Sequence, residues 1–355
     1  PKPSSAASDV YKRQNTYMAR CLELARKGAG FVSPNPMVGC VIVYKNRIIG
    51  EGYHQKYGEN HAEVNAINMV KNKRELEGAT LYVNLEPCCH FGKTPPCCHL
   101  IVKVGISSVV IGSKDNSKKV NGLGIKYLQE NNVKVKVGLL KKECLELNKR
   151  FFTYHQKNRP YIILKWAETK DGFMDIVRKG KKKEINWISS ENSKTLVHQW
   201  RAHEDAILAG RTTVENDNPK LTVREVKGIN PVRVILDPNL KLGSDYNIFD
   251  NSSKTIIANL IVEEKKDNIF YLKCKEKDMI LNLLNYLYQM EISSIIIEGG
   301  FKTITSFINN NYWDEARVIV GNKLFKNGLK SPVLNKKWIS KDEIGQDTLL
   351  KYLND

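Results

Sequence analysis

The chain lacks the features that would place it in a membrane or direct it out of the cell. No apolar run approaches the roughly 18 residues that a membrane-spanning helix needs, and the longest aliphatic stretches, such as residues 294–298, have the length of a strand. Residues 1–14 are small and polar and contain no apolar stretch of the signal-peptide type. We therefore expect a cytoplasmic protein without a membrane partner, and we interpret residues 1–14 as a non-native or disordered leader with no part in the fold.

Acidic residues are scarce relative to basic ones. The chain has 56 Lys and Arg against 38 Asp and Glu, a formal net charge of +18. Residues 1–150 hold 24 of the basic and only 12 of the acidic residues. Such an excess suits either nucleic acid or a small anionic substrate. Because the lysines are scattered instead of following one element, the pattern favours the small substrate, and we expect no nucleic-acid partner.

Strands alternate with helices in both halves of the 355-residue chain, which indicates two α/β domains, residues 15–150 and 151–355. Residues 141–158 form a polar, helical connector. In the first half we expect strands at 37–44, 48–53, 79–85, 108–112 and 133–137 and helices at 15–27, 61–70 and 124–131. In the second half we expect about seven strands, at 161–166, 205–208, 232–236, 255–258, 269–272, 294–298 and 316–320, and helices at 193–201, 279–290 and 302–309. The charge run 178–184 is interpreted as an exposed hairpin loop.

The strongest chemical signal is a group of metal-binding residue types. Four of the eight cysteines form two adjacent pairs, 88–89 and 97–98, close to histidines, which in a cytosolic chain indicates metal more than disulfide. His61, Cys88 and Cys97 offer one imidazole and two thiolates, which suit one Zn²⁺ per chain with an open fourth position. Water bound there would have a pKa of about 7. Glu63 stands two residues from His61, where it can carry a proton between that water and a leaving amine.

Three other interpretations of these residues remain open. The zinc site could be closed and structural, with a fourth ligand from His90, His99, Cys89 or Cys98, although such a site gives Glu63 no task. The protein could deaminate bases of a nucleic acid, but the second half has the smaller charge and no aromatic stacking pattern. It could also be a non-enzymatic, zinc-stapled binding protein, against which Glu63, Lys165 and Glu298 argue.

The metal motif resembles the signature of the zinc-dependent cytidine-deaminase superfamily, H-x-E with P-C-x-x-C. Here eight residues, instead of two, separate Cys88 from Cys97, and by this pattern Cys89 and Cys98 are not ligands. The expanded stretch is similar to the family of bifunctional riboflavin-biosynthesis deaminase/reductases. The same resemblance is carried by residues 34–43 (PNPMVGCVIV), 50–54 (GEGYH), 86–97 (EPCCHFGKTPPC), 164–165, 171–172, 187–189, 217–224 (DNPKLTVR) and 298–300, from about Thr16 onward.

This resemblance implies a fold and two successive reactions. The first half would be a cytidine-deaminase-like three-layer α/β/α domain, and the second a dihydrofolate-reductase-like α/β domain. The first would hydrolyse the 2-amino group of 2,5-diamino-6-ribosylamino-4(3H)-pyrimidinone 5′-phosphate with zinc on His61, Cys88 and Cys97 and Glu63 as proton carrier. The second would reduce the ribosyl group with NADPH. A homo-oligomer is expected.

The resemblance also assigns binding residues in the first half. Asn35, His54, His90 and Lys93 would line the pyrimidine and ribose-phosphate pocket, although His54 and His90 could equally be ordinary polar surface. The loop at residues 115–120 departs from the family's D-P-N-P-x-V pattern: the expected Asn is Ser117 and both prolines are missing. This change puts the grip on the phosphate in doubt, whereas the zinc chemistry does not depend on it.

The second half contains no G-x-G-x-x-G after a strand, so an ordinary dinucleotide-binding fingerprint is not supported. The turn at Gly299 and Gly300 before an expected helix could admit a pyrophosphate or be a plain tight turn. Residues 209–213 (AGRTT) resemble the G-R-x-T turn of dihydrofolate reductases. By family position the NADPH side would comprise Glu168 (through its backbone), Trp187, Arg211, Thr213, Asp217, Pro238, Gly300, Phe301, Lys302, Thr303, Ile304, Thr305 and Ser306.

The substrate side of the second half would comprise Lys165, Arg201, Leu221, Arg224 and Glu298. The two arginines suit a 5′-phosphate. Lys165 and Glu298 could polarise or protonate the ribose during hydride transfer, and Arg211 could recognise the 2′-phosphate that distinguishes NADPH from NADH. Trp187 could instead be a core aromatic residue.

Overall fold

The computed structural model describes residues 5–92, 95–117, 120–177 and 186–354. The chain divides after Asn158 into two units, each of which is described by itself. This division lies a few residues beyond the predicted boundary near residue 150, because the connector is helical and belongs to the first unit. The connector consists of α5 (Lys141–Leu147) and α6 (Lys149–Lys157).

The first unit is built on a five-stranded mixed sheet with the order β2-β1-β3-β4-β5. β1 is antiparallel to β2 and β3, while β3, β4 and β5 run parallel. All five strands were predicted within two residues at either end. Their bounds are β1 Gly39–Tyr44, β2 Arg47–Tyr53, β3 Thr80–Leu85, β4 Ser108–Ser113 and β5 Lys134–Val137.

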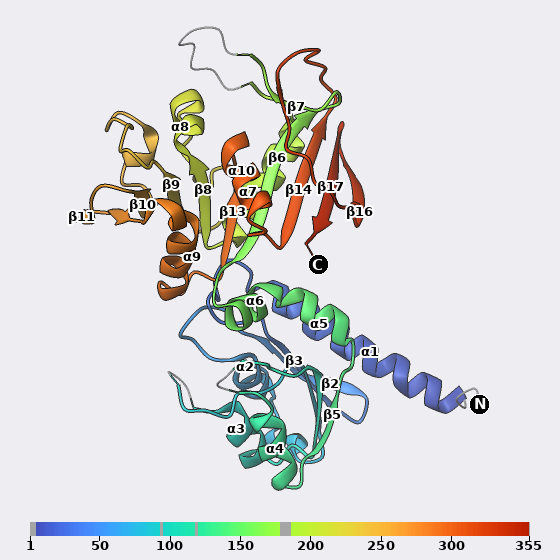
Figure 1. The fold of residues 1–355 in the computed structure, drawn as a ribbon. Coiled ribbons are helices and arrows are strands. Elements are labelled where there is room, and N and C mark those ends of the chain that lie inside the picture. Colours follow the sequence, from blue (N-terminus) through green and yellow to red (C-terminus); the bar gives the residue numbers. More distant parts are fainter. Residues whose placement is uncertain (1–4, 93–94, 118–119, 178–185, 355) are drawn as a thin grey trace. The chain divides into compact units, whose positions relative to one another are not determined.

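Helices cover both faces of this sheet, as the three-layer prediction requires (Figure 1). One apolar cluster joins Ile42 and Leu81 to Ala66 and Leu128, and so holds α2 (Ala62–Met69), α3 (Cys97–Lys103) and α4 (Leu123–Glu130). A second cluster joins Val41 and Tyr82 of the opposite face to α1 (Ser5–Arg26) and α5. A short 3₁₀ turn, η1, spans Lys73–Leu76. Alternating strand residues therefore fill two cores, which is the reason for three layers.

Helix α1 begins earlier than the sequence suggested. It starts at Ser5, inside the segment interpreted as a leader, and runs without a break into the predicted helix at residues 15–27. Near its middle, Gln14 Oε1 accepts a hydrogen bond of 2.9 Å from Lys136 Nζ of β5. The part of the predicted leader that the structure describes is thus helical.

The second unit is built on a ten-stranded sheet with the order β11-β12-β10-β9-β8-β13-β6-β14-β17-β16. The strands from β12 to β14 in this order are all parallel, and antiparallel strands flank them. The prediction of about seven strands was too low. Bounds are β6 Tyr161–Thr169, β8 Ala206–Gly210, β9 Val232–Leu236, β10 Thr255–Asn259, β11 Glu264–Lys266, β12 Ile269–Lys273, β13 Ser294–Ile297, β14 Glu315–Gly321, β16 Ser340–Ile344 and β17 Asp347–Leu353.

Helices again lie on both faces of this sheet (Figure 1). α9 (Met279–Gln289) and α10 (Phe301–Asn309) cover one face, while α7 (Glu191–His203) and α8 (Arg211–Asp217) lie on the other. A small sheet pairs β7 (Phe173–Asp175) with β15 (Leu329–Lys330), and two 3₁₀ turns, η2 and η3, span Asn247–Phe249 and Glu276–Asp278. The charge run at residues 178–184 lies outside the described residues.

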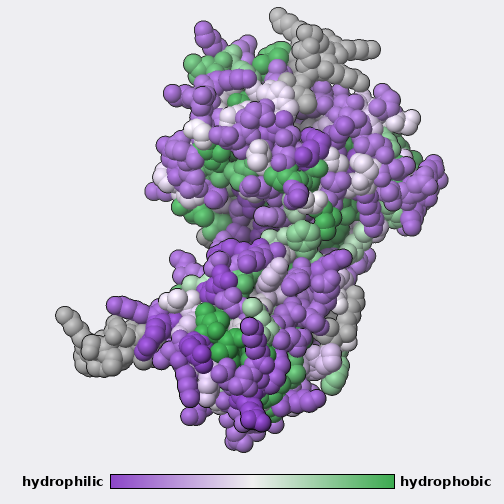
Figure 2. Space-filling model, turned by 180° about the vertical axis from the view of Figure 1, so that it is seen from behind, coloured by the Kyte–Doolittle hydropathy of each residue, from purple (hydrophilic) through white to green (hydrophobic). Residues whose placement is uncertain are grey.

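The surface agrees with the high charge of the chain. Hydrophilic residues dominate the visible face of each unit, with smaller hydrophobic areas between them (Figure 2). Among the described residues, none of the helices combines the length and the apolar character needed to cross a lipid bilayer.

Candidate active sites

Three elements bring His61, Cys88 and Cys97 together in the first unit. His61 is the N-cap residue of α2, Cys88 follows β3, and Cys97 is the first residue of α3. His61 Nδ1 lies 3.3 Å from the Sγ atom of each cysteine. A tetrahedral zinc with bonds of about 2.0–2.3 Å separates its nitrogen and sulfur ligands by about 3.5 Å. The three side chains therefore fit one zinc ion.

The electrostatics of the cluster also suit a metal. A hydrogen bond from Cys97 and the proximity of His61 outweigh burial and lower the pKa of Cys88, while the same contact and burial raise the pKa of Cys97, so that Cys88 is the first of the two thiols to lose its proton. Within the described part of the chain, no fourth side chain joins these three ligand atoms. A closed, structural zinc site would need its fourth ligand from His90, His99, Cys89 or Cys98. His90 is exposed, and the other three form a separate group.

Glu63 lies in the first turn of α2, and its side chain is buried, with 3% of its surface exposed. Burial raises the pKa of its carboxyl, and the charge of Cys88 raises it further. The first turn of one helix thus presents a metal ligand and a protonatable carboxylate to the same space, as the spacing of His61 and Glu63 predicts.

Asn35 and His54 lie beside the cluster. Asn35 Nδ2 is 3.1 Å from His54 Nε2, and His54 Nδ1 is 3.0 Å from the carbonyl oxygen of Asn60. The rings of His54 and His61 meet edge to face with centroids 5.5 Å apart. His54 is buried, so the alternative of polar surface does not apply to it, and burial lowers its pKa toward the neutral form. His90, in contrast, is exposed, and Lys93 lies outside the described residues.

The loop that departs from the family pattern is held by a residue that the sequence analysis did not assign. The buried carboxylate of Glu86 accepts hydrogen bonds from the backbone N–H groups of Asp115, Gly122 and Ile125, at 3.1–3.2 Å. Ser117 is buried and its N–H donates to Asp115 Oδ1 at 2.7 Å. Three charge-assisted bonds thus order the described part of this loop without the two prolines. Glu86 immediately precedes the Pro-Cys motif, a proximity that could have drawn attention to it.

The second unit contains a cavity of about 1130 Å³ at the carboxyl ends of β6, β8, β9 and β13. These four strands are neighbours and parallel, so the residues that follow them converge at one edge of the sheet. The predicted residues that line the cavity are Lys165, Trp187, Arg201, Arg211, Thr213, Asp217, Leu221, Arg224, Pro238, Glu298, Gly300, Phe301, Lys302, Thr303 and Ser306.

Three predicted residues are not among those that line the cavity. Glu168 accepts a hydrogen bond from Trp166 Nε1 at 2.9 Å, Ile304 is fully buried in the core beneath α10, and Thr305 Oγ1 is buried. Position 304 faces the sheet because successive helical residues are about 100° apart, whereas Thr303 faces the cavity. Trp187 is 51% exposed, which rules out the core position considered for it.

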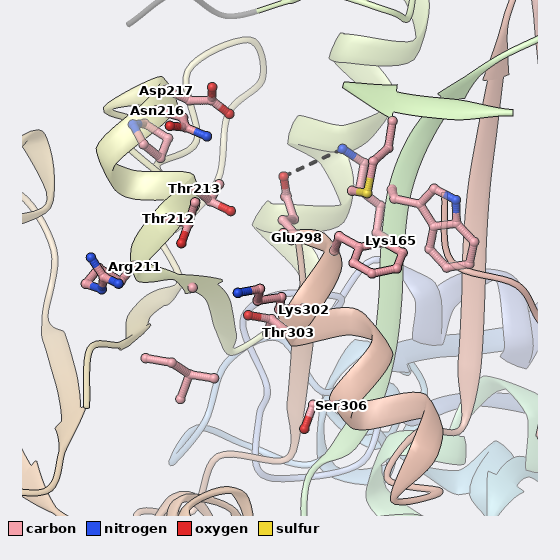
Figure 3. A pocket seen from close by; sticks show the side chains of 18 of the residues that line it. Lys165, Arg211, Thr212, Thr213, Asn216, Asp217, Glu298, Lys302, Thr303 and Ser306 are labelled. Atoms are coloured by element: carbon pink, nitrogen blue, oxygen red, sulfur yellow. Dashed lines mark ion pairs between the residues drawn. The ribbon is translucent and has the colours of Figure 1, made fainter. Parts of the chain in front are cut away.

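Lys165, Arg201 and Glu298 form a largely buried charged group at the cavity. Figure 3 shows Lys165 and Glu298, two members of this group. Arg201 donates two hydrogen bonds to the Glu298 carboxylate, at 2.7 and 2.8 Å, and Lys165 Nζ lies 3.6 Å from its Oε2 atom. Burial alone would raise the pKa of Glu298, but the charges of Arg201 and then Lys165 outweigh it and lower the pKa to about 2. Burial lowers the pKa of Lys165, against the effect of Glu298.

On the other side of the cavity, the N-terminal ends of α8 and α10 lie close to each other; Thr213 of α8 and Thr303 of α10 are labelled in Figure 3. A Cβ atom at Gly210 would lie 2.5 Å from Thr303 Oγ1, and one at Gly300 would lie 2.9 Å from Thr213 Oγ1. A side chain at either position would therefore force the facing threonine side chain to move. Arg211, at the start of α8, pairs with Glu215 and lies 3.8 Å from Asp237.

Several residues near the cavity were missed by the sequence analysis. Thr212, Asn216 and Asn218 line it from α8 and its C-cap, and residues 277–281 line it from η3 and the start of α9. His198 Nδ1 accepts a hydrogen bond from the N–H of Arg224 at 3.1 Å, and burial together with Arg201 lowers its pKa to about 4. The helix α8 was not predicted, and its recognition would have indicated Thr212 and Asn216.

Comparisons with known proteins bear on both sites. Residues 11–113 match the family model of the cytidine and deoxycytidylate deaminase zinc-binding region, and residues 160–333 match that of the RibD C-terminal domain. The riboflavin biosynthesis protein RibD of Aquifex aeolicus is 40% identical over 323 residues, which cover 88% of each chain. The chain belongs to the RibD family. The RibD of Actinobacillus pleuropneumoniae is 38% identical and covers 95% of this chain and 94% of its own.

A solved structure of the RibD family has the same fold. The diaminohydroxyphosphoribosylaminopyrimidine deaminase/5-amino-6-(5-phosphoribosylamino)uracil reductase of Thermotoga maritima matches with a TM-score of 0.89 and 35% identity, over 98% of this chain and 100% of its own. The resemblance stated from the motifs is therefore confirmed. The chain is a bifunctional deaminase/reductase of riboflavin biosynthesis with a deaminase-like first domain and a dihydrofolate-reductase-like second domain.

Proposed function

We propose that the first unit hydrolyses the 2-amino group of 2,5-diamino-6-ribosylamino-4(3H)-pyrimidinone 5′-phosphate. The observation that carries this proposal is the group of His61, Cys88 and Cys97 with the buried Glu63 beside it. Zinc held by these three ligands would lower the pKa of a water molecule to about 7. Glu63 takes a proton from the attacking water and delivers it to the amino nitrogen as the C–N bond breaks, because its raised pKa suits both transfers.

Asn35 and His54 support the position of the pyrimidine in this proposal. The contact between Asn35 Nδ2 and His54 Nε2, with His54 Nδ1 near the carbonyl of Asn60, fixes the orientation of both side chains. The neutral imidazole of His54 thus orients the Asn35 amide, which can hydrogen-bond a heterocycle, without adding charge to a site that already holds two cysteines and a carboxylate. His90 and Lys93 are proposed to contact the ribose phosphate.

The second unit is proposed to reduce the ribosyl group of the deaminated product to a ribityl group, giving 5-amino-6-(5-phosphoribitylamino)uracil. A cavity of about 1130 Å³ has room for a dinucleotide and a substrate together. NADPH bound in it would supply the hydride. Lys165 would donate a proton to the ribose ring oxygen as the bond from C1′ to that oxygen breaks, and Glu298, 3.6 Å from Lys165 Nζ, would keep Lys165 in place.

Charged side chains on two sides of the cavity support the assignment of phosphate groups. Arg224 and Arg201 suit the substrate's 5′-phosphate, and Leu221 lines the wall beside them. On the cofactor side, Arg211 suits the 2′-phosphate and the N-terminal turn of α10 offers free N–H groups to the pyrophosphate. Trp187, Thr213, Asp217, Pro238, residues 300–303 and Ser306 are proposed to complete the cofactor site, with Glu168 contributing through its backbone.

Mass spectrometry of the phosphorylated diaminopyrimidine, incubated with the zinc-loaded protein, tests this proposal. Without NADPH we expect a gain of about 1 Da, since an amine is exchanged for a carbonyl oxygen, and with NADPH a further gain of about 2 Da. The chelator-treated protein is the control and should give neither change. An unchanged substrate mass in both incubations of the loaded protein would contradict the assignment. The expected homo-oligomer and the cytoplasmic location stay predictions.

A further inference from the structure

Cys89 and Cys98 lie together next to the zinc-ligand cluster, although neither is needed as a ligand there. Their Sγ atoms are 2.6 Å apart. The backbone holds the two segments side by side, because the N–H of Cys98 donates to the carbonyl of Cys88 at 3.1 Å and the N–H of Cys97 to Cys88 Sγ at 3.4 Å. In each Cys-Cys pair, one sulfur therefore lies beside His61, and the other lies in the contact between Cys89 and Cys98.

The distance between the two sulfur atoms distinguishes a shared metal site from a site of disulfide formation. Thiolates bound to one tetrahedral zinc at about 2.3 Å are about 3.8 Å apart, so 2.6 Å is too short for a shared metal ion. A disulfide bond needs only a further approach to about 2.05 Å. The neighbouring His99, which could complete a metal site, stacks on the ring of Tyr127 with centroids 4.4 Å apart.

The two thiols differ in accessibility in the way that an oxidation site requires. Cys89 is half-buried and reachable from solvent, whereas Cys98 is fully buried directly behind it. The four cysteines outside the two Cys-Cys pairs, Cys21, Cys40, Cys144 and Cys274, are all buried. Cys88 is exposed to a similar degree but belongs to the zinc-ligand cluster, so Cys89 is the accessible cysteine outside that cluster, and Cys98 is in place to react with its oxidation product.

We propose that Cys89 and Cys98 are an oxidative modification site that forms an intrachain disulfide with a peroxide oxidant. The Cys89 sulfur attacks one oxygen of hydrogen peroxide, the O–O bond breaks, the proton of the thiol passes to the departing hydroxide, and Cys89 becomes a sulfenic acid as one water leaves. The Cys98 sulfur then attacks Cys89 Sγ, the S–S bond forms, the S–O bond breaks, and a second water leaves. Two thiols lose two electrons and two protons, and the peroxide is reduced to two waters.

This disulfide would connect the two ends of the segment that separates Cys88 from Cys97 in the sequence. Cys89 and Cys98 are adjacent in the sequence to the zinc-ligand residues Cys88 and Cys97. The new bond therefore joins the two ends of segment 89–98 without using a sulfur of the zinc-ligand cluster. The same segment contains His90 and Lys93, the residues proposed to contact the substrate phosphate. Oxidation would thus join the two ends of a segment that, under the proposed function, contacts the substrate phosphate.

The test is peptide mapping of the full-length, zinc-loaded protein before and after treatment with stoichiometric hydrogen peroxide. Denaturation with chelator and alkylation should detect eight thiols before treatment and two fewer afterwards, with an intact mass lower by about 2 Da. Trypsin cleaves after Arg74, Lys93 and Lys103, so the disulfide should join peptide 75–93 to peptide 94–103. Fragmentation between residues 88 and 89, and between 97 and 98, identifies the sulfurs that are linked.

Variants make the test specific. Cys89→Ser and Cys98→Ser should each abolish the linked peptides and retain one zinc per chain, while Cys274→Ser, a control in the second unit, should form the link like the parent protein. Cys89 is half-buried, so its variant is the safer one if Cys98→Ser fails to fold. A link that contains Cys88 or Cys97 in the zinc-loaded protein would overturn the proposal. A second zinc per chain that is lost in Cys89→Ser, or no link in the parent protein, would also overturn it.

Discussion

At the scale of single residues, the two sites treat a buried carboxylate in opposite ways. Burial raises the pKa of Glu63, and the negative charge of the neighbouring Cys88 raises it further. Glu298 is buried to a similar degree, but Arg201 and Lys165 outweigh the effect of burial and lower its pKa to about 2. A carboxyl of the first kind holds its proton to higher pH than an ordinary glutamate and can both accept and release it, whereas one of the second kind stays ionised. Their environments thus agree with a proton carrier in one unit and an electrostatic anchor in the other.

The pKa of Lys165 predicts the alkaline side of the pH profile for reduction. Burial lowers this pKa below its ordinary value of 10.5. If protonated Lys165 donates the proton to the ribose oxygen, the rate must fall as pH rises through that lowered pKa, and hence below pH 10.5. In Lys165→Arg, whose side chain stays protonated at these pH values, the fall should move to higher pH. An alkaline limb that does not move would exclude Lys165 as the proton donor.

Arg211 predicts the choice of cofactor. Removing a charge-assisted contact with a phosphate costs about 1.5–3 kcal/mol, so Arg211→Gln should raise the KM for NADPH by about tenfold to a hundredfold. The KM for NADH, which has no 2′-phosphate, should change little. Lys254→Gln, which removes an exposed charge outside the cavity of the same unit, is the matched control. Equal losses with the two cofactors would show that Arg211 does not recognise the 2′-phosphate.

At the scale of elements, the apolar strands and their partner helices were predictable, and short or polar elements were not. β13 (SIII) and β9 (VRVIL) are rich in β-branched residues, which identify them as strands in the sequence. β16 (SKDEI) has a polar sequence and lies at a sheet edge, where it needs no apolar faces. α8 was missed because its seven residues include two threonines and an Asn next to an Asp, and its place is fixed by packing of Val214 against the sheet. Tertiary contacts, which a local pattern does not contain, decide such segments.

The unpredicted β16–β17 hairpin is held to α7 by one carboxylate. Asp347 Oδ2 accepts hydrogen bonds from the N–H and Oγ of Ser190, both at 2.7 Å, and from Ser193 Oγ at 2.6 Å. Because Asp347→Ala leaves one buried and two part-buried donors without a partner, it should lower the free energy of unfolding of the second unit by about 2–4 kcal/mol.

Urea unfolding followed by tryptophan fluorescence measures this effect in the second unit alone, since all five tryptophans lie after residue 158. Asp342→Ala provides the comparison: it removes an exposed carboxylate from the same hairpin, paired with Lys351 at 3.3 Å, and should cost less than about 1 kcal/mol. Equal effects of the two substitutions would show that the contact between Asp347 and α7 contributes little.

At the scale of the whole molecule, the chain carries two sites in two units, and the two were predictable to different degrees. His61, Glu63, Cys88 and Cys97 are visible in the sequence because motif spacing and metal chemistry constrain them tightly. The reductase cavity depends instead on the strand order β9-β8-β13-β6, which brings residues 165, 211, 238 and 298 to one sheet edge. Only the family resemblance related these distant positions before the structure did, and it also included Ile304 and Thr305, which the structure places away from the cavity lining.

The central claim is that each unit performs its own step, and a crossed pair of variants tests it most directly. Product masses should be measured for Glu63→Gln and Lys165→Met in the presence of NADPH. Each variant is incubated separately with the diaminopyrimidine and with the deaminated substrate. Glu130→Gln, which changes an exposed residue on α4, is the control. We expect Glu63→Gln to lose deamination by about 10²–10⁴-fold and to keep reduction, and Lys165→Met to do the reverse. Loss of both steps in either zinc-loaded, folded variant, or full deamination by Glu63→Gln, would contradict the account.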